Sequence, residues 1–490
     1  MAGVVKWVAR LLAVSALMLP IGVPLLHAQS ANLSAGDAQS ANTSDPNAPD
    51  RTIQLLRDDE DWSFLKDANL REDFWDPVKF IPLSSNGDWY VTISGEAREV
   101  WEQIGNDNWG QSPFWNAYLN ERYMLGFDIH YGEYVRTFVE LKSGLNSFRI
   151  GGPRPIDEKK LDFQAAYLQV GTSSSAQNSI QFLVGRQELE YGSGRLVDVR
   201  EGPNVRLSFD GFRIKLKPNK WNVDAFAMRP DEDNPGFFDN APNPHVAFWG
   251  VYSTRPLAKK TLLDLYYLGL DRTEATFERG TAAELRHSVG GRLSRSIAVE
   301  KNGWDFDYEA LWQFGSFGSA GIRAWTAASE TGYRFVDTPL KPHLTVKADI
   351  SSGDNPRSDN LGTFNPLFPK GNYFGVLATT GPGPINFIDL HPDLELSIPH
   401  NLLLSAGWIF QWRESLEDGV YAVPGFLITA ANGSLARYVG NRPGTQLRWQ
   451  ANQHLWFQGD YGIFFAGPFL KQAGPGRNLN YWALWAGYEF

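Results

Sequence analysis

Residues 89–98, Trp-Tyr-Val-Thr-Ile-Ser-Gly-Glu-Ala-Arg, alternate between apolar or small side chains and polar ones. The same period of two recurs in residues 135–142, 344–350 and 402–413, and it continues to the last residue, Phe490. Alternation of this length is typical of β-strands with one apolar face. The opposite face carries charged side chains, which fits either a solvated sheet or a water-filled lumen.

The lengths of the connections distinguish between these two structures. Roughly 18 strand-like segments lie between Trp89 and Phe490, as in a mid-sized barrel. If the first segment runs outward, the connections after odd-numbered segments are long: 103–116, 146–160, 191–203, 231–243, 354–389, 414–433 and 467–478. Those after even-numbered segments are tight, near Gly132, Pro218-Asn219, Pro256-Leu257, His400 and Asn452, and the short connection at 316–318 is the exception. We therefore predict an all-β fold, a transmembrane antiparallel β-barrel of about 18 strands with long extracellular loops and short periplasmic turns.

Composition excludes several other classes of protein. The chain has 490 residues, of which 14% are aromatic, so it is too rich in large rings for a disordered protein. It contains no Cys, which excludes disulfides, thiolate metal sites and Cys nucleophiles. The formal net charge of -10 leaves no electrostatic basis for nucleic-acid binding. A mean hydropathy of -0.32 is compatible with a barrel, because alternating residues average out.

The N-terminus resembles a secretory signal peptide. Lys6 and Arg10 precede an apolar run from Leu11 to Leu26, and Ala28 offers a small residue for cleavage. An uncleaved N-terminal anchor is the alternative. The predicted organisation is a signal peptide (1–28), a flexible polar tail (29–50), an N-terminal periplasmic segment (51–88) and an outer-membrane barrel (89–490). We expect the protein in the outer membrane of a Gram-negative bacterium.

The final strand supports export to that membrane. Its apolar residues share one face, and the chain ends on an aromatic ring: Trp482, Leu484, Ala486, Tyr488 and Phe490. An aromatic last residue resembles the recognition signal of outer-membrane proteins, so barrel-assembly machinery and outer-membrane lipid are expected partners.

Several motifs resemble the alginate-export outer-membrane porin family. They occur in one consistent order over about residues 52–490: Gly185-Arg186-Gln187, 191–198, Leu268 to Arg272, Arg286-His287, Trp304 to Glu309, Gln313-Phe314-Gly315, Ser352-Gly353-Asp354, 363–369, Tyr373-Phe374-Gly375, Trp412-Arg413 and 418–421. The resemblance implies a monomeric 18-stranded barrel that passes an anionic, alginate-like polysaccharide through an arginine-lined lumen. It also implies periplasmic export proteins as partners, and it does not fix the substrate.

Alternation identifies candidate lumen cations. An anionic polymer requires fixed positive charge, and Arg pairs with carboxylates in a planar, bidentate manner. The basic residues that fall opposite apolar strand residues are Arg98, Arg122, Arg136, Lys142, Arg186, Arg213, Lys215, Arg292, Arg323, Lys347, Arg413 and Arg448. The alternative is that these residues brace the wall in salt bridges with acids such as Glu96, Glu140 and Asp349.

The connection 354–389 is the candidate gate or constriction, because long structureless loops are uncommon unless they are functional. Its aromatic residues are the candidates that contact substrate: Phe364, Phe368, Tyr373 and Phe374. Acids in the loops, Asp231 to Asp233 with Asp354 and Asp359, suggest either a surface site for a divalent ion or solvated loop. We predict no bound metal.

No enzyme motif is present: the sequence lacks His-Glu-x-x-His, the Gly-x-Ser-x-Gly elbow and a P-loop. We therefore predict no catalytic residues and no cofactor. A barrel enzyme is the weaker alternative. A general or substrate-specific porin for small sugars, carboxylates or aromatic acids is the stronger one.

Overall fold

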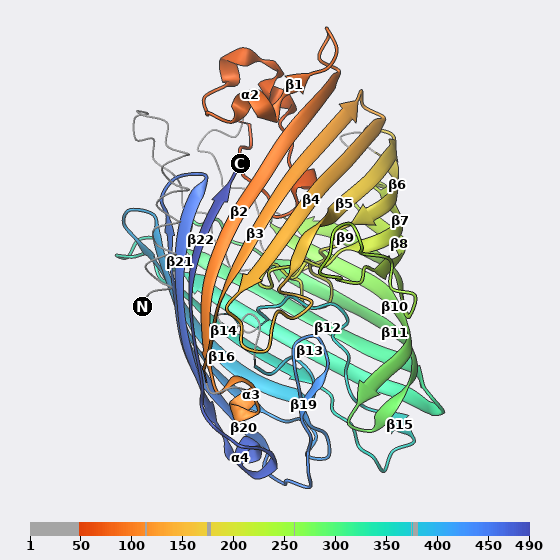
Figure 1. Ribbon diagram of the computed structural model, residues 1–490, viewed down its shortest axis with the longest axis vertical. Coiled ribbons are helices and arrows are strands. Elements are labelled where there is room, and N and C mark those ends of the chain that lie inside the picture. The colour runs from red at the N-terminus through yellow and green to blue at the C-terminus, as the bar shows by residue number, and fades with distance from the viewer. Residues whose placement is uncertain (1–48, 113–114, 174–177, 259, 374, 376–380) are drawn as a thin grey trace.

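The computed structural model describes residues 49–112, 115–173, 178–258, 260–373, 375 and 381–490. Within them, 18 antiparallel strands close into one barrel, because the first strand of the wall pairs with the last (Figure 1). The strands are β2 (Trp89–Gly105), β3 (Trp115–Tyr131), β4 (Val135–Ser147), β5 (Lys159–Gly171), β6 (Ile180–Gln187), β7 (Phe209–Leu216), β8 (Asn222–Pro230), β9 (Val246–Ala258), β10 (Thr261–Phe277), β11 (Gly280–Arg295), β12 (Gly303–Phe317), β13 (Ala320–Arg334), β14 (His343–Ser351), β16 (Phe387–Ile398), β17 (Leu402–Trp412), β20 (Tyr438–Gln450), β21 (Leu455–Ala466) and β22 (Leu479–Glu489). The predicted fold is confirmed.

A glycine allows the seam to close. The backbone N–H and C=O of Gly95 and Phe490 exchange hydrogen bonds of 2.9 and 3.0 Å. A Cβ atom on Gly95 would lie 2.3 Å from the Phe490 ring, so any larger residue there would force the ring aside. The last residue, Phe490, is thus hydrogen-bonded to the first strand of the wall and packs its ring over Gly95.

The connections sort by length between the two ends of the barrel. At one end, here called the long-loop end, lie 106–114, 148–158, 188–208, 231–245, 352–386, 413–437 and 467–478. At the other, the short-turn end, the connections include 132–134, 217–221, 259–260, 399–401 and 451–454. Two connections at the long-loop end are short, 278–279 and 318–319. The long-loop end also carries β15 (Asn360–Leu361), β18 (Val420–Tyr421), β19 (Leu427–Thr429) and the helices α3 (Asp107–Gly110) and α4 (Pro468–Ala473).

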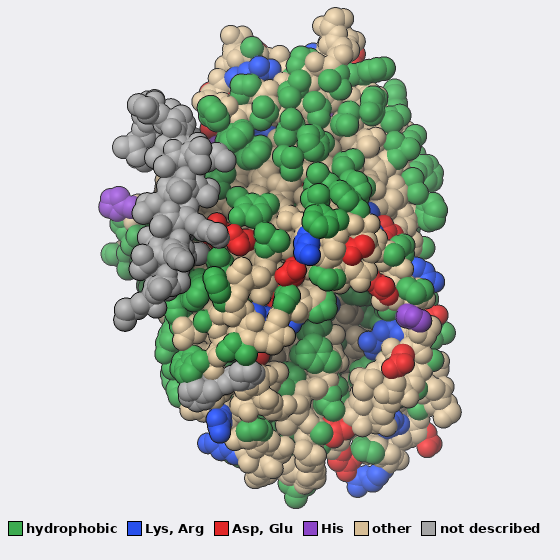
Figure 2. Space-filling model, viewed as in Figure 1, with side chains coloured by type: hydrophobic (Ala, Val, Ile, Leu, Met, Phe, Trp, Pro, Cys, Tyr) green, Lys and Arg blue, Asp and Glu red, His purple; other side chains and the backbone are tan. Residues whose placement is uncertain are grey.

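The two faces of the wall differ in chemistry. On β6 the alternate residues Phe182 and Val184 are exposed, whereas Leu183 between them is 2% exposed. Figure 2 shows apolar side chains crowded over the upper part of the visible wall and charged ones toward the long-loop end. An outward apolar band is what hydrocarbon requires, because an unpaired polar group there costs several kcal/mol. No helix among the described residues is long and apolar enough to cross a membrane.

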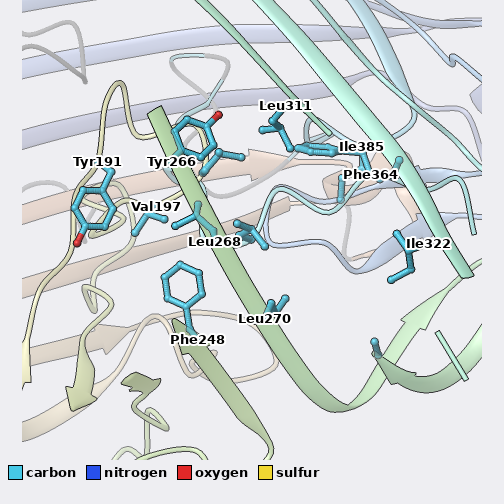
Figure 3. Packing of buried hydrophobic residues seen from close by; sticks show 14 of the residues in the cluster. Tyr191, Val197, Phe248, Tyr266, Leu268, Leu270, Leu311, Ile322, Phe364 and Ile385 are labelled. Carbon is cyan, nitrogen blue, oxygen red and sulfur yellow. The ribbon is translucent and has the colours of Figure 1, made fainter. Parts of the chain in front are cut away.

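The loop 188–208 and the described residues of the loop 352–386 fold into the barrel instead of outward. They pair with each other in parallel: the N–H of Asp198 donates to the carbonyl of Phe368, and the N–H of Phe368 donates to that of Leu196. We call residues 194–198 and 368–370 the inner ribbon. Its apolar side packs against the inner wall, where Val197 lies near Phe248 and Leu268 (Figure 3).

A small N-terminal cap, residues 60–82, closes over the short-turn end (Figure 1). It comprises the 3-10 turns η2 (Ser63–Lys66) and η3 (Ala68–Leu70), the helix α2 (Asp76–Lys79) and the strand β1 (Ile81–Pro82), which pairs with β2. A further turn, η1 (Arg57–Asp59), precedes the cap. Trp62, Leu65 and Phe80 form a core of its own. The predicted signal peptide, 1–28, and residues 29–48 of the predicted tail lie outside the described residues.

Candidate functional site

Cross-strand pairing shows which predicted cations point into the lumen. Residues paired across two strands share a face, and Arg98 pairs with Arg122, Arg213 with the buried Phe226, and Lys347 with Glu330. The inward face carries nine of the candidates: Arg98, Arg122, Arg136, Lys142, Arg213, Lys215, Arg292, Lys347 and Arg448. Nine of the twelve predicted cations therefore face inward, and these remain candidates for a substrate path.

Arg323 lies on the outer face, contrary to the prediction. Its cross-strand partner is Phe314, which is 42% exposed, while its neighbours Ile322 and Ala324 are buried inside. It is the fourth residue after the tight connection at 318–319, near the rim of the long-loop end. Because it is so close to that rim, its charge can reach water.

Arg186 also departs from the predicted face. It follows Val184 and Phe182 on the outward parity, but a segment of the 231–245 loop covers it, since Phe237 forms a bridge to Leu161 beside the short strands. Its guanidinium contacts Asp210 at 2.9 Å and Asp231 at 3.5 Å. Arg186 therefore fastens this loop to the wall.

Arg413 lies in the loop after β17 and faces no open lumen. Its guanidinium is fully buried and donates to the backbone carbonyls of Leu416, Asp418, Ser434 and Ala436. It also stacks 3.9 Å from the centroid of the Phe469 ring. All these partners hold the 413–437 loop in shape, so the role of Arg413 is structural.

Three arginines converge on one carboxylate in the middle of the lumen. Arg98 Nη1 lies 3.0 Å from Glu201 Oε1, Arg206 Nε lies 3.4 Å from Oε2, and Arg122 pairs with the same group. We call Arg98, Arg122 and Arg206 the arginine triad. The Glu201 side chain is 39% exposed while the arginines are buried, although its Oε2 atom is itself covered.

The triad determines the charge state of Glu201. Burial raises the pKa of Glu201, but Arg122, Arg206 and Arg98 together lower it to about 2. Arg122 keeps a second partner, Glu96, at 2.7 Å. Glu201 is thus a permanent anion at neutral pH, and the triad is an anion site filled by the chain itself.

A second cluster lies on β10 to β12 beside the inner ribbon. Arg292 pairs with Asp264 at 3.0 Å and with Asp307, and Arg195 of the ribbon reaches the same Asp307 at 2.8 Å. Arg195 also lies 3.6 Å from Glu309. Here the wall-brace interpretation fits the geometry, because every cation has an acid of the wall as its partner.

The remaining inward cations vary in their pairing. Arg213 donates to Asp224 at 2.7 Å, Lys347 lies 3.6 Å from Glu330, and Lys142 lies within 3.7 Å of Asp231. Arg448 instead stacks over the Trp456 ring, 4.1 Å from its centroid.

The candidate gate residues pack against the wall. Phe364 is 2% exposed in the large inner core, and the Phe368 ring lies 4.9 Å from that of Phe248. The Tyr373 hydroxyl donates to Asp349 at 3.1 Å. Phe374 lies outside the described residues. The three described rings help hold their loop inside the barrel; Phe364 is buried, whereas Phe368 and Tyr373 are partly buried and remain candidates.

The loop acids are mostly neutralised by neighbours rather than solvated. Asp231 and Asp354 are buried, the first beside Lys142 and Arg186 and the second paired with Arg279 at 2.7 Å. Among the described residues, no group of three or more acidic or histidine side chains is arranged to hold a metal ion.

The predicted set omits three inward arginines of the strands, Arg286, Arg334 and Arg442, which share the parity of the buried face. It also omits Arg195, Arg206 and the acid Glu201, which lie in an irregular segment where alternation gives no information. The only signal was indirect: the motif at 191–198 marked the segment as part of a family pattern, and 191–203 was one of the long connections.

Structural comparison places the fold among outer-membrane porins. Pseudomonas aeruginosa OccK2 (OpdF) aligns with a TM-score of 0.56 at 10% identity, over 82% of this chain and 97% of its own. A structure of the same protein in complex with glucuronate aligns with a TM-score of 0.55 at 10% identity, over 82% of this chain and 98% of its own. Acinetobacter baumannii OccAB1 gives 0.54 at 10% identity, over 86% of this chain and 99% of its own.

The sequence comparison is more specific. No protein among those of curated function matches the chain. The profile of the family described as alginate export matches residues 90–483, which is nearly the whole barrel and includes the triad, the inner ribbon and Glu201. The chain belongs to the alginate export family.

Proposed function

We propose that this barrel conducts an anionic, uronate-type polysaccharide across the outer membrane of a Gram-negative bacterium. The short-turn end then faces the periplasm and the long-loop end faces the exterior. Membership in the alginate export family supports this proposal. The glucuronate complex of OccK2, a barrel of similar fold, supports a uronate as the kind of sugar involved.

The observation that carries the proposal is the Glu201 carboxylate held by the arginine triad. A sugar carboxylate has the same two oxygens and the same charge, so it can take over the ion pairs that Glu201 makes with Arg98 and Arg206. Glu201 lies on a loop and its side chain is 39% exposed, whereas Arg98 is buried on the wall, so Glu201 is the member of the cluster that we expect to move aside.

Because the cations are paired with wall acids, they should bind a substrate carboxylate weakly enough to release it, as transport requires. Arg122 retains Glu96 and Arg292 retains Asp264 when a substrate carboxylate arrives. Conduction requires sites that attract a substrate and also release it, and a half-compensated arginine gives a weaker hold than a bare one. A chain of such sites lets each uronate pass from one arginine to the next.

The second candidate is a porin for small carboxylates or sugars. The inner ribbon favours it, because two loops packed inside the barrel reduce the space for a polymer. The two candidates share the triad and differ in the length of the solute. Under either, the side chains of the lumen bind and release solute and carry out no chemistry, so we propose a monomeric channel without a catalytic role.

A zero-current potential tests the charge selectivity of the lumen. The purified barrel is placed in a planar bilayer under a KCl gradient, and we expect a sign that indicates anion preference. The double variant Arg98→Gln/Arg122→Gln should move the potential toward cation preference. Arg323→Gln, on the outer face, is the matched control. Cation preference of the wild-type channel would overturn the proposal.

A further inference from the structure

A loop of the N-terminal segment, residues 52–59, enters the lumen from the short-turn end. Both of its ends are fixed at the cap: Arg51 pairs with Asp76 at 3.0 Å, and Glu60 pairs with Lys79 at 3.2 Å. Between them the chain reaches wall residues. Arg136 donates to the carbonyl of Asp58 at 2.6 Å, and Arg206 of the triad donates to that of Leu55 at 3.1 Å.

The acids of this loop meet a basic part of the wall. Tyr167 donates a hydrogen bond of 2.6 Å from its hydroxyl to the Asp58 carboxylate. Asp59 is exposed to the lumen, and Lys215, Arg213 and Arg136 act on it electrostatically.

Every wall residue in that group lies close to a short turn. Arg136 follows the turn 132–134, Tyr167 precedes the one that begins at 172, and Lys215 precedes 217–221. The group therefore forms one site at the mouth of the lumen on the short-turn side, in which Arg136 also pairs with Asp128 and Arg213 with Asp224 of the wall.

The basic residue of the loop meets an acidic part of the wall. Arg57 is 7% exposed and pairs with Glu60 at 3.2 Å and with Glu489 of the closing strand at 3.3 Å. Burial lowers the pKa of Arg57, but Glu489 and other acids around it raise it above its ordinary value. The positive and negative side chains of the loop thus lie near wall charges of opposite sign. This complementarity favours one position of residues 52–59 in the lumen.

We propose that Arg136, Tyr167, Arg213 and Lys215 form an entrance site for two adjacent carboxylates, and that residues 52–59 are a plug that fills this site with Asp58 and Asp59 until an anionic polymer displaces them. The choice of a uronate polymer rests on the proposed function. Consecutive uronates carry one carboxylate each, so two adjacent acids of the chain imitate a short stretch of the substrate.

The cap can stay in place while the plug leaves. Two kinds of contact attach the cap to the barrel rim. The Trp75 ring stacks 3.8 Å from that of Phe490, and β1 pairs with β2. The plug is held in the lumen mainly by hydrogen bonds and charge. Polymer carboxylates can replace those contacts, whereas they cannot replace the stacking of Trp75.

The test compares two double variants of equal charge. Asp58→Asn/Asp59→Asn weakens the plug, and Asp50→Asn/Asp61→Asn removes two exposed acids outside the lumen. Asn retains the oxygens with which Asp50 and Asp61 accept the N–H of Thr52 and Ser63. We expect the first variant to raise the conducting fraction in planar bilayers about tenfold, the factor that one charge-assisted hydrogen bond supplies, with no change in the second.

Thiol accessibility provides an independent measurement. The chain has no Cys, so Gln169→Cys, the cross-strand partner of Arg136, introduces a single thiol at the entrance site. A sulfonate-bearing methanethiosulfonate should modify this thiol about tenfold faster when Asp58 and Asp59 are Asn. The plug competes for the same site, so the reagent reaches the thiol only in the fraction of molecules that are unplugged. Equal rates and equal conducting fractions in the two double variants would overturn the plug.

The outcomes separate the plug from the proposed function. An opened Asp58→Asn/Asp59→Asn variant that binds an oligouronate about tenfold more tightly than wild type supports both. Opening with no oligouronate binding supports the plug and overturns the uronate assignment. If the conducting fraction of Asp58→Asn/Asp59→Asn equals that of the wild type while anion selectivity is intact, the plug is overturned and the proposed function is not.

Discussion

Glu201 forms a 3.0 Å ion pair with Arg98, which stands 103 residues earlier on the first strand of the wall. This pair joins the loop inside the barrel to the barrel itself. Because Glu201 is the partly exposed member, the pair also reports how strongly the lumen attracts a carboxylate.

Replacement of Glu201 by Gln should strengthen binding of anionic solutes. The amide keeps the shape but gives up the charge, so Arg98 and Arg206 become available to a solute carboxylate. We expect an oligouronate to block the current at about tenfold lower concentration, the equivalent of one charge-assisted hydrogen bond. Glu133→Gln, on an exposed turn, is the control. Weaker block in the Glu201 variant would contradict this role.

Anion preference should increase as the pH falls. Burial and neighbouring acids raise the pKa of Glu188 and of Glu190 to about 7, despite the opposing effect of Arg206. Both side chains take up protons as the pH falls through that value, which removes negative charge beside the triad. Between about pH 8 and about pH 6 the anion-to-cation permeability ratio should therefore rise. The variant Glu188→Gln/Glu190→Gln should abolish the rise, and a ratio that falls on acidification would refute the assignment.

Arg413 and Arg323 both lie outside the open lumen, so replacing either should leave ion selectivity unchanged. The two replacements should differ in their effect on the stability of the folded barrel. Arg413→Gln leaves several buried carbonyls of the 413–437 loop without a donor, at a cost of about 1–3 kcal/mol each. Arg323→Gln should change stability by less than about 0.5 kcal/mol. The temperature at which the folded, fast-migrating band disappears on gels measures the difference. A shift of the zero-current potential in Arg413→Gln would show that the residue contributes to the lumen after all.

The rim stack should control attachment of the cap. Trp75 stacks on Phe490 and donates to the Tyr488 hydroxyl at 2.7 Å. Trp75→Leu removes this ring pair, worth about 1 kcal/mol beyond its buried area, and exposes the cap to trypsin at Lys66 and Arg71. Phe74→Leu, the neighbouring ring that is 67% exposed, should leave cleavage unchanged. Equal cleavage in both variants would mean that another contact holds the cap.

Alternation was sufficient to predict the barrel and most of its inward cations. Arg98, Arg136 and Lys347 lie in long, regular strands where parity fixes the face. The prediction was wrong at Arg186 and Arg323, which lie near strand ends beside a loop or a tight turn, and at Arg413, where β17 has already ended. Parity itself holds at Arg323: it points outward because its neighbours Ile322 and Ala324 face inward and pack in the inner core. Arg186 also keeps the outward parity of Phe182 and Val184, but a loop covers it.

The interior loops and the plug could not be predicted in the same way. Glu201 and Arg206 meet Arg98 only because the 188–208 loop folds inward, and that path depends on packing against the far wall. Likewise the charges of 57–61 have the composition of a solvated segment. The wall partners of Asp58 are distant in the chain, with separations of 78 residues to Arg136 and 109 to Tyr167.

Current block by an oligouronate, compared with a neutral oligosaccharide of equal length, is the most direct test of whether the lumen arginines bind a uronate. We expect concentration-dependent block by the oligouronate only. The block should weaken about tenfold in Arg122→Gln, because the Arg122 guanidinium pairs with both Glu96 and Glu201. Equal block by the neutral sugar, or block that Arg122→Gln leaves unchanged, would contradict uronate binding by the lumen arginines.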